Sequence, residues 1–533
     1  MQMKIRKEIK KDIPHGLMDK WRGVVSHTHM LRSHESPFEK TKENLVAWCR
    51  RYNVSAVGVG SPWEPVSAKH YGHYERMERD LYYSGKLDPK SVMDRKELKK
   101  LFNDLNRMSG GRTFFYQDNE NPKGRFGHLW YFGYKYDFPA WHDYSQDRPI
   151  SYYDNDPCKE INSITGRPHT RRPYLEVVAT QRKAGAVAVW AHPTSWWFDG
   201  KGGFVTNIAS EAVLHLLADG YLDGMVVQGY DAFHRHYQQL WFYLLDFGAF
   251  VPGFAETDSC FDKANLIDSD HVYMNYMKIG GKLSNRKIVS AVRGNCHFSS
   301  SGAFLSLDVE GVPMGGILTR RTGERIIAKV EAYPVAGQKK ISRLDLIGRG
   351  GKTLATVKDF TGGILELELK VNKLPDYVIA RTMGESDSID AVSQKQIRHM
   401  AITNPVYIRE KGFEFKPVPT KCAFKFSSGS HWHGGKMIIE KADGTFLEEN
   451  KIRSGTCKLV LPASARVRFL KSGSEEKMFY IAMANEKVHE HLRYLHNGEF
   501  LKDYPGLRPG EVPAEAFRLP QVKEAISEFS KSF

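Results

Sequence analysis

Short apolar runs that end in histidine or carboxylate residues recur through the first 300 residues, and they constrain the fold more than any other feature. VVSHTHM at 24–30 precedes a helical segment at 37–51, and VSAVGVGS at 54–61 follows as a second buried strand. AVAVWAHP at 186–193 and VPGFAETDS at 251–259 have the same character. Such strand–helix units predict a parallel α/β sheet or barrel, whose chemistry lies at the carboxyl ends of the strands. We expect further strands at 113–120, 127–134 and 224–229, and helices at 94–108 and 234–247.

The pattern changes near residue 302. Alternating runs separated by Gly and Pro turns, such as SGAFLSLDVEG at 301–311 and RIIAKVEAY at 325–333, predict a β-sandwich. A further β-rich piece contains a turn at Asp443–Gly444. Because 533 residues exceed what one core supports, we expect several domains. These are an α/β barrel over 1–300, a β-sandwich over 301–412, and a small β-rich region with a Pro-rich tail over 413–533.

Charge and hydropathy limit the partners of the chain. The formal net charge of +15 suggests nucleic acid, but Lys and Arg are spread thinly and no known reader motif occurs. A basic protein that acts on an anionic small molecule explains the charge equally well. No apolar run reaches about 18 residues, and the basic start of the chain has no apolar stretch behind it. We therefore expect a soluble protein without nucleic-acid or membrane partners, cytoplasmic, or periplasmic if a signal peptide was removed; its oligomeric state stays open.

Metal-capable side chains stand at the ends of the expected strands. In His27-Thr28-His29, residues i and i+2 of a strand point to the same side, so two imidazoles can meet one ion. The alternative is a pair of partly buried histidines that hydrogen-bond to backbone. Other strand ends carry the nitrogen and oxygen ligands that Zn²⁺, Mn²⁺ or Fe²⁺ accept. These further candidates are Asp118, Glu120, His128, His192 and Asp258.

The order of these motifs resembles a known family. A His-x-His pair, a Glu followed by GHL at 127–129, an AHP strand end and a Gly-x-x-x-x-Asp strand are similar to the PHP (polymerase and histidinol phosphatase) phosphoesterases. Within that superfamily the chain most resembles the CehA/McbA-type metallohydrolases, over residues 20 to 410. The resemblance implies an α/β fold, a distorted (β/α)7 PHP-like barrel followed by β-sandwich-type domains. The closer match lies in residues 240–259, 292–316, 343–351 and 380–408.

The resemblance also implies a set of metal ligands. The family's third ion requires three histidines, of which His34 can supply the first. The second position falls in GSPWEP at 60–65, which has no Asp-His, and Cys260 occupies the third. We therefore expect two divalent ions, Zn, Mn or Fe, that share one bridging carboxylate. The first would be held by His27, His29, Glu120 and Asp258, and the second by Glu120, His128 and His192.

Two such ions would activate a water molecule, so the chain is expected to be a metal-dependent hydrolase. Bridged ions lower the pKa of bound water toward neutrality and supply a hydroxide nucleophile. Neither a G-x-S-x-G elbow nor a papain-like cysteine offers another nucleophile. Loss of the third ion favours carboxylic or carbamic esters over phosphate monoesters, although phosphoesters stay open. The substrate is expected to be a sugar-like or aromatic small molecule.

Other residues are candidates for supporting roles. His34 is a candidate general acid, beside His169 and the helical pair His234 and His236. Arg293 is a candidate catalytic residue toward an anionic group, and Arg32 a candidate substrate-binding residue, against the alternative of solvated surface arginines. Flat aromatic side chains close after His192 would suit a sugar ring or an aromatic ester, or would simply pack an insertion. These side chains are Trp196 and Trp197.

Three other functions remain as alternatives. A metal-assisted glycan-processing enzyme, lyase or glycosidase-like, would suit the aromatic insertions and the β-domains. A non-catalytic carbohydrate-binding protein on a decayed barrel would explain the missing Asp-His. Retention of the other metal-capable residues speaks against decay, and a nucleic-acid enzyme rests on net charge alone.

Overall fold

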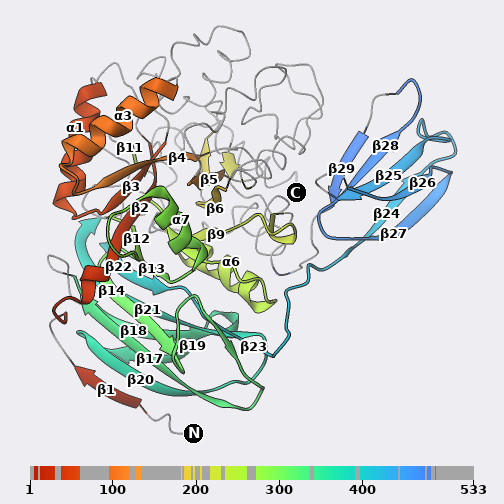
Figure 1. Cartoon of the computed structure of the whole chain (residues 1–533). Coiled ribbons are helices and arrows are strands. Elements are labelled where there is room, and N and C mark those ends of the chain that lie inside the picture. The colour runs from red at the N-terminus through yellow and green to blue at the C-terminus, as the bar shows by residue number, and fades with distance from the viewer. Residues whose placement is uncertain are drawn as a thin grey trace, which may run out of the picture.

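The computed structural model describes those parts of the chain that Figure 1 draws in colour. These are residues 5–9, 13–29, 38–60, 95–120, 128–133, 182, 185–193, 196–198, 204–206, 216–229, 234–257, 259–260, 272–335, 341–389, 396–441, 445–474, 477–481 and 487.

One 16-stranded mixed sheet runs through most of the described residues. Its order is β10-β9-β6-β5-β4-β3-β2-β12-β13-β22-β21-β18-β19, with β11 on β2 and with β23 pairing β21 and β16. The amino-terminal strands are β2 (Trp21–His29), β3 (Ala56–Val59), β4 (Phe114–Glu120), β5 (His128–Phe132), β6 (Val187–Ala191), β9 (Gly224–Gln228), β10 (Gly253–Ala255) and β11 (Ser259–Cys260). The later strands are β12 (Met274–Lys278), β13 (His297–Ser300), β16 (Ile317–Thr319), β18 (Ile341–Gly348), β19 (Lys352–Lys358), β21 (Asp376–Ile389), β22 (Gln396–Thr403) and β23 (Val406–Arg409).

Both faces of the amino-terminal part of this sheet are covered. Strands β3, β6, β9 and β10 are buried at every position, in keeping with their largely apolar sequences. Helices α1 (Phe38–Arg51) and α3 (Arg95–Met108) lie beside each other (Figure 1). They pack Leu45 and Leu105 against Val57 and Phe115. Helix α6 (His234–Asp246) packs Trp241 into a second core with Trp130 and Trp190. Helix α7 (Asn285–Arg293) lies near β12, and β7 (Trp196–Phe198) pairs with β8 (Phe204–Thr206).

A second, five-stranded sheet faces the carboxyl-terminal part of the first. Its strand β17 (Arg325–Pro334) alternates buried and exposed residues, as expected for a sheet with one solvated face. Inward residues such as Val330 share one core with Leu344 and Leu346 of β18. The other strands of the five are β1 (Ile5–Ile9), β14 (Ala303–Val309), β15 (Val312–Pro313) and β20 (Gly363–Lys370).

Two small sheets form the last described part of the chain and have a core of their own around Phe469 and Met437. The Ser464 hydroxyl, in the turn before β28, donates to the Asp219 carboxylate and joins this part to the rest. Figure 1 shows these strands as a separate blue body. They are β24 (Thr420–Phe426), β25 (Lys436–Lys441), β26 (Phe446–Lys451), β27 (Gly455–Leu461), β28 (Ala465–Leu470) and β29 (Lys477–Ile481).

The expected distorted (β/α)7 barrel is wrong. Among the described residues strand far outweighs helix, whereas a β/α barrel needs a helix after each strand. Strand β5 is antiparallel to both its neighbours, and β12 is antiparallel to β2. Among the described strands the ladder ends at β10 and β19 without closing, and it crosses the boundary expected at residue 300. Apolar runs identify buried strands, but they do not give strand direction or partners.

No helix in the described part of the chain has both the length and the apolar character required to cross a membrane.

A histidine lies in the core where β10 approaches β13, and it is expected to make stability depend on pH. His297 is fully buried, and its Nε2 donates to the Gly253 carbonyl at 3.1 Å. Burial lowers the pKa of His297 from 6.5 to about 4, although the hydrogen bond to Gly253 acts in the opposite direction. Between these values the unfolded chain binds a proton that the folded chain does not. The contribution of His297 to stability is therefore fully present above pH 6.5, and it is lost as the pH falls toward 4.

The loss attributable to His297 is about 3 kcal/mol over that range. Urea unfolding of wild type and His297→Gln at a series of pH values measures it. The difference in unfolding free energy between wild type and variant should shrink as the pH falls below 6.5. A difference that stays constant down to pH 4 would contradict the assignment.

Candidate metal centre

His27 lies at an irregularity in β2. The register between β2 and β3 shifts between Val25 and Thr28, and His27 has a φ of 60°. A bulge of this kind redirects a side chain out of the strand alternation. The backbone is held there by the Asp118 carboxylate, whose Oδ2 accepts from the His27 N–H at 2.8 Å. The expectation that His27 and His29 point to the same side requires a regular strand, and β2 is irregular at His27.

Gly58 of β3 leaves the space that this contact requires. A Cβ atom at Gly58 would lie 2.5 Å from Oδ2 of Asp118. Beside it, Oγ1 of Thr28 donates to the Gly58 carbonyl at 2.7 Å. The small residue in VSAVGVGS thus allows the Asp118 carboxylate to reach the His27 backbone.

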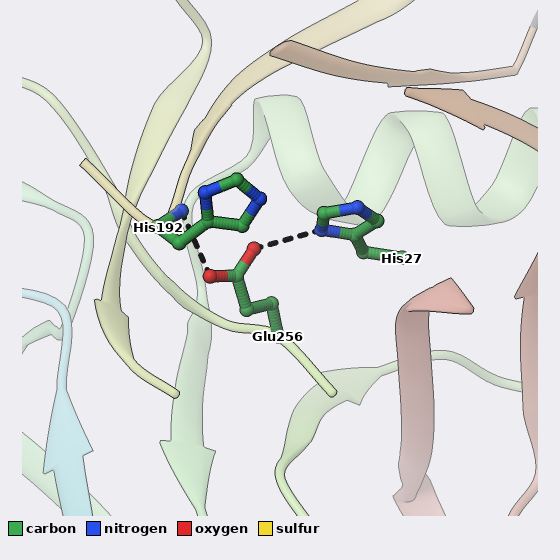
Figure 2. Close-up of side chains that lie close together, drawn as sticks. All are labelled: His27, His192 and Glu256. Carbon is green, nitrogen blue, oxygen red and sulfur yellow. Dashed lines mark hydrogen bonds and ion pairs between the residues drawn. The ribbon is translucent and has the colours of Figure 1, made fainter. Parts of the chain in front are cut away.

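Glu256, directly after β10, joins the two histidine segments (Figure 2). His27 donates from Nδ1 to Oε2 of Glu256 at 2.8 Å, and the His192 backbone N–H donates to Oε1 at 2.8 Å. The side chain of Glu256 is 0% exposed. Its carboxylate therefore fixes the His27 ring and the backbone of His192 together.

His192 completes the cluster from the end of β6. Its φ of 21° is unusual for a residue with a Cβ atom. Its ring stacks on that of His27, with ring centroids 5.4 Å apart and an interplanar angle of 27°. His27, His192 and Glu256 are all buried, and each offers a ligand atom within 4.8 Å of the others.

This donor set fits a divalent metal ion. Bonds to Zn²⁺ from nitrogen and oxygen are about 2.0–2.2 Å, so atoms on opposite sides of one ion lie about 4 Å apart. Separations up to 4.8 Å close onto one ion with shifts below about 1 Å. Two imidazoles and a carboxylate are a ligand combination that Zn²⁺, Mn²⁺ and Fe²⁺ accept.

Three of the other expected ligands, His29, Glu120 and His128, lie at strand ends near the site by backbone register. His128 pairs with Ala191, the residue before His192, and Glu120 pairs with Trp130 on the same strand as His128. His29, the last residue of β2, pairs with Cys260 of β11. The side chains of His29, Glu120 and His128, and all of Asp258, lie outside the described residues. The expectation of two ions stays a prediction.

Glu256 was missed by the sequence reasoning. In GFAETDS the resemblance directed attention to Asp258, the carboxylate that matches the family spacing. The available signal was position, because Glu256 is the first carboxylate after the apolar run and β10 ends one residue before it.

The residues expected in supporting roles are not brought together at the site in the described part of the chain. Arg293 is exposed at the end of α7, and its Nη2 donates to the Gly185 carbonyl at 3.0 Å. Gly185 precedes β6 while His192 follows it, a separation of about 20 Å along the strand. The structure therefore does not bring Arg293 to the site. Trp196 and Trp197 belong to β7, but their side chains lie outside the described part, as do those of Arg32, His34, His169, His234 and His236.

Comparisons with known proteins leave the family open. No protein-family model and no curated protein matches the chain, so the PHP resemblance stays a prediction. One similar solved structure is BcpA, the major pilin subunit of Bacillus cereus, with 11% identity, 35% of this chain and 68% of that chain covered, and a TM-score of 0.14.

Two other solved structures are similar at the same level. The BSP domain of a biofilm associated protein has 10% identity, with 32% of this chain and 29% of that chain covered and a TM-score of 0.12. The apo structure of Bacteroides uniformis beta-glucuronidase 3 has 10% identity, 86% and 62% covered, and a TM-score of 0.14. TM-scores this low support no assignment of fold or function.

Proposed function

We propose that the protein is a metal-dependent hydrolase that cleaves an ester-type bond at a site built on His27, His192 and Glu256. The observation that carries the proposal is the meeting of these three buried side chains from separate strands within one ion's reach. The buried Glu256 carboxylate accepts hydrogen bonds from His27 and from the His192 backbone, and a divalent ion would add the positive charge that a buried carboxylate favours. Such an ion would be held by His27, His192 and Glu256, and it would supply a bound water with a pKa near neutrality.

The backbone at both histidines supports a functional reading. Non-glycine residues at positive φ cost about 1–3 kcal/mol each, and they cluster at active and ligand-binding sites. Both His27 and His192 have positive φ, and both are held by carboxylates through their backbone N–H groups. Asp118 and Glu256 thus position the imidazoles before any ligand binds.

Metal analysis joined to hydrolysis assays tests this proposal. Wild type is reloaded with Zn²⁺ or Mn²⁺, dialysed and analysed by mass spectrometry beside His27→Ala and His192→Ala. p-Nitrophenyl phosphate, bis-p-nitrophenyl phosphate and p-nitrophenyl acetate are assayed on the same samples. We expect bound metal in wild type, loss of metal in both variants, and activity reduced at least about 100-fold on the ester that wild type hydrolyses.

His431→Ala provides a matched control. His431 is an exposed histidine in the carboxyl-terminal part, where its Nε2 contacts the Ser474 hydroxyl. This variant should retain the metal and activity of wild type. Wild type without metal after reloading, or metal retained in both site variants, would overturn the proposal.

A further inference from the structure

The free edge of β10, the strand that leads into Glu256, is completed by side chains. Among the described strands β10 pairs only with β9, in parallel register. On its other edge, Gly253 and Ala255 present backbone N–H and C=O groups to residues of β12, β13 and the segment after β22. An unpaired strand edge in a protein interior would leave these groups without hydrogen bonds.

Asn275 of β12 satisfies both backbone groups of Ala255. The Ala255 N–H donates to Oδ1 of Asn275 at 2.7 Å, and Nδ2 of Asn275 donates back to the Ala255 carbonyl at 2.7 Å. The Asn side-chain amide carries the donor and acceptor of a peptide group, so it replaces a neighbouring strand at this point. Asn275 is 0% exposed, and the Ser299 hydroxyl donates to its Oδ1 at 3.1 Å.

The side chains of Asn404 and His297 satisfy the two backbone groups of Gly253. The Gly253 N–H donates to Oδ1 of Asn404 at 2.7 Å, and Nε2 of His297 donates to the Gly253 carbonyl at 3.1 Å. Asn404 in turn donates to the His297 carbonyl at 3.2 Å. Gly253 lies three residues before Glu256, whereas Ala255, which Asn275 contacts, lies directly before it.

Asn275 also belongs to the strand beside His27. Strand β12 pairs antiparallel with β2, and Asn275 lies opposite Val24, three residues before His27. One side of Asn275 is therefore held by the backbone ladder to the His27 strand, and its amide holds the residue before Glu256.

We infer that Asn275 is a positioning residue that holds Glu256 within hydrogen-bond distance of His27 and so assembles the metal centre. The inference deepens the proposed function and rests on it for the role of the assembled cluster. Replacing the Asn275 amide by a carboxylate keeps its shape but removes the donor to the Ala255 carbonyl. That change displaces the end of β10, and with it Glu256, from His27.

Asn275→Asp and Asn404→Asp form a matched pair for the test. Both are buried isosteric changes on the same edge of β10. We expect Zn²⁺ affinity, measured by competition with a chromogenic chelator, to fall about 10–100-fold in Asn275→Asp. In Asn404→Asp it should change less than about 3-fold, below the range typical of residues that orient ligands. Ser299→Ala, which removes only the hydroxyl donor to Asn275, should show a smaller loss in the same direction and serves if Asn275→Asp does not fold.

A second readout needs no metal. In ¹⁵N-histidine-labelled protein, the Nδ1 proton that His27 donates to Glu256 gives a downfield resonance, assigned by its absence in His27→Gln. The resonance should shift or vanish in Asn275→Asp and persist in Asn404→Asp. Equal effects of the two variants, or no effect of either, would overturn the inference. If wild type binds no Zn²⁺ while the resonance changes only in Asn275→Asp, the proposed function fails and the positioning role stands.

Discussion

Glu256→Gln is expected to reduce metal affinity and hydrolysis more than any other conservative change in the protein. The glutamine keeps the size of the side chain, and its amide oxygen still accepts from the His192 N–H. It loses the negative charge, and it places an amide nitrogen where Oε2 accepts from Nδ1 of His27. We expect metal affinity at least about 10-fold lower and hydrolysis about 100-fold slower.

Titration with Zn²⁺ and steady-state assays on the same preparations measure both effects. The matched control is Glu331→Gln, at a carboxylate that accepts from the Tyr333 hydroxyl in β17. The control should bind metal and hydrolyse substrate as wild type does. Wild-type metal affinity in Glu256→Gln would show that Glu256 only braces the backbone.

Asp345→Ala is expected to cause a large loss of stability, because it removes a fully buried carboxylate that three side chains contact. The Asp345 side chain is 0% exposed, and it accepts from Nε of Arg343 at 2.7 Å, the Thr356 hydroxyl at 2.8 Å and Nη2 of Arg381 at 3.1 Å. Its removal leaves Arg381, which is 21% exposed, without its carboxylate. Breaking a buried pair costs about 3–5 kcal/mol, and the partial solvation of Arg381 places this variant near about 3 kcal/mol.

Glu368→Ala is the matched control for that variant. Glu368 of β20 pairs with Arg325, whose side chain is 64% exposed. Exposed pairs contribute about 0–1 kcal/mol, so the free energy of unfolding should fall by no more than that. Guanidinium unfolding of both variants measures the contrast. Equal losses would mean that burial does not govern the contribution of these pairs.

The sequence located individual elements well because their local patterns are strong. The strand expected at 186–193 is β6 at Val187–Ala191, and the helix expected at 94–108 is α3 at Arg95–Met108. The sequence did not predict how the strands pair or in which direction they run. HLWYF has the same apolar character whether it runs parallel or antiparallel to β6, and the structure makes β5 antiparallel.

The residues of the candidate site could likewise be predicted only in part. His27 and His192 could be chosen from the sequence, because both follow apolar runs and both have a side chain that binds metals. Glu256 could not be preferred to Asp258, since the two carboxylates are two residues apart in one motif. Asn275 carried no signal at all, because an isolated asparagine within MNYMK reads as an ordinary strand residue.

By itself the sequence determined where buried strands and amphipathic helices form and which strand ends carry metal-capable side chains. These properties depend on hydrophobic periodicity and on residue type, which are local. The tertiary structure alone decided the pairing of β12 with β2, the bulge at His27, the meeting of Glu256 with two histidines, and the side-chain completion of β10. Each of these depends on contacts between residues tens to hundreds of positions apart, and no local pattern encodes which distant backbone group a side chain will meet.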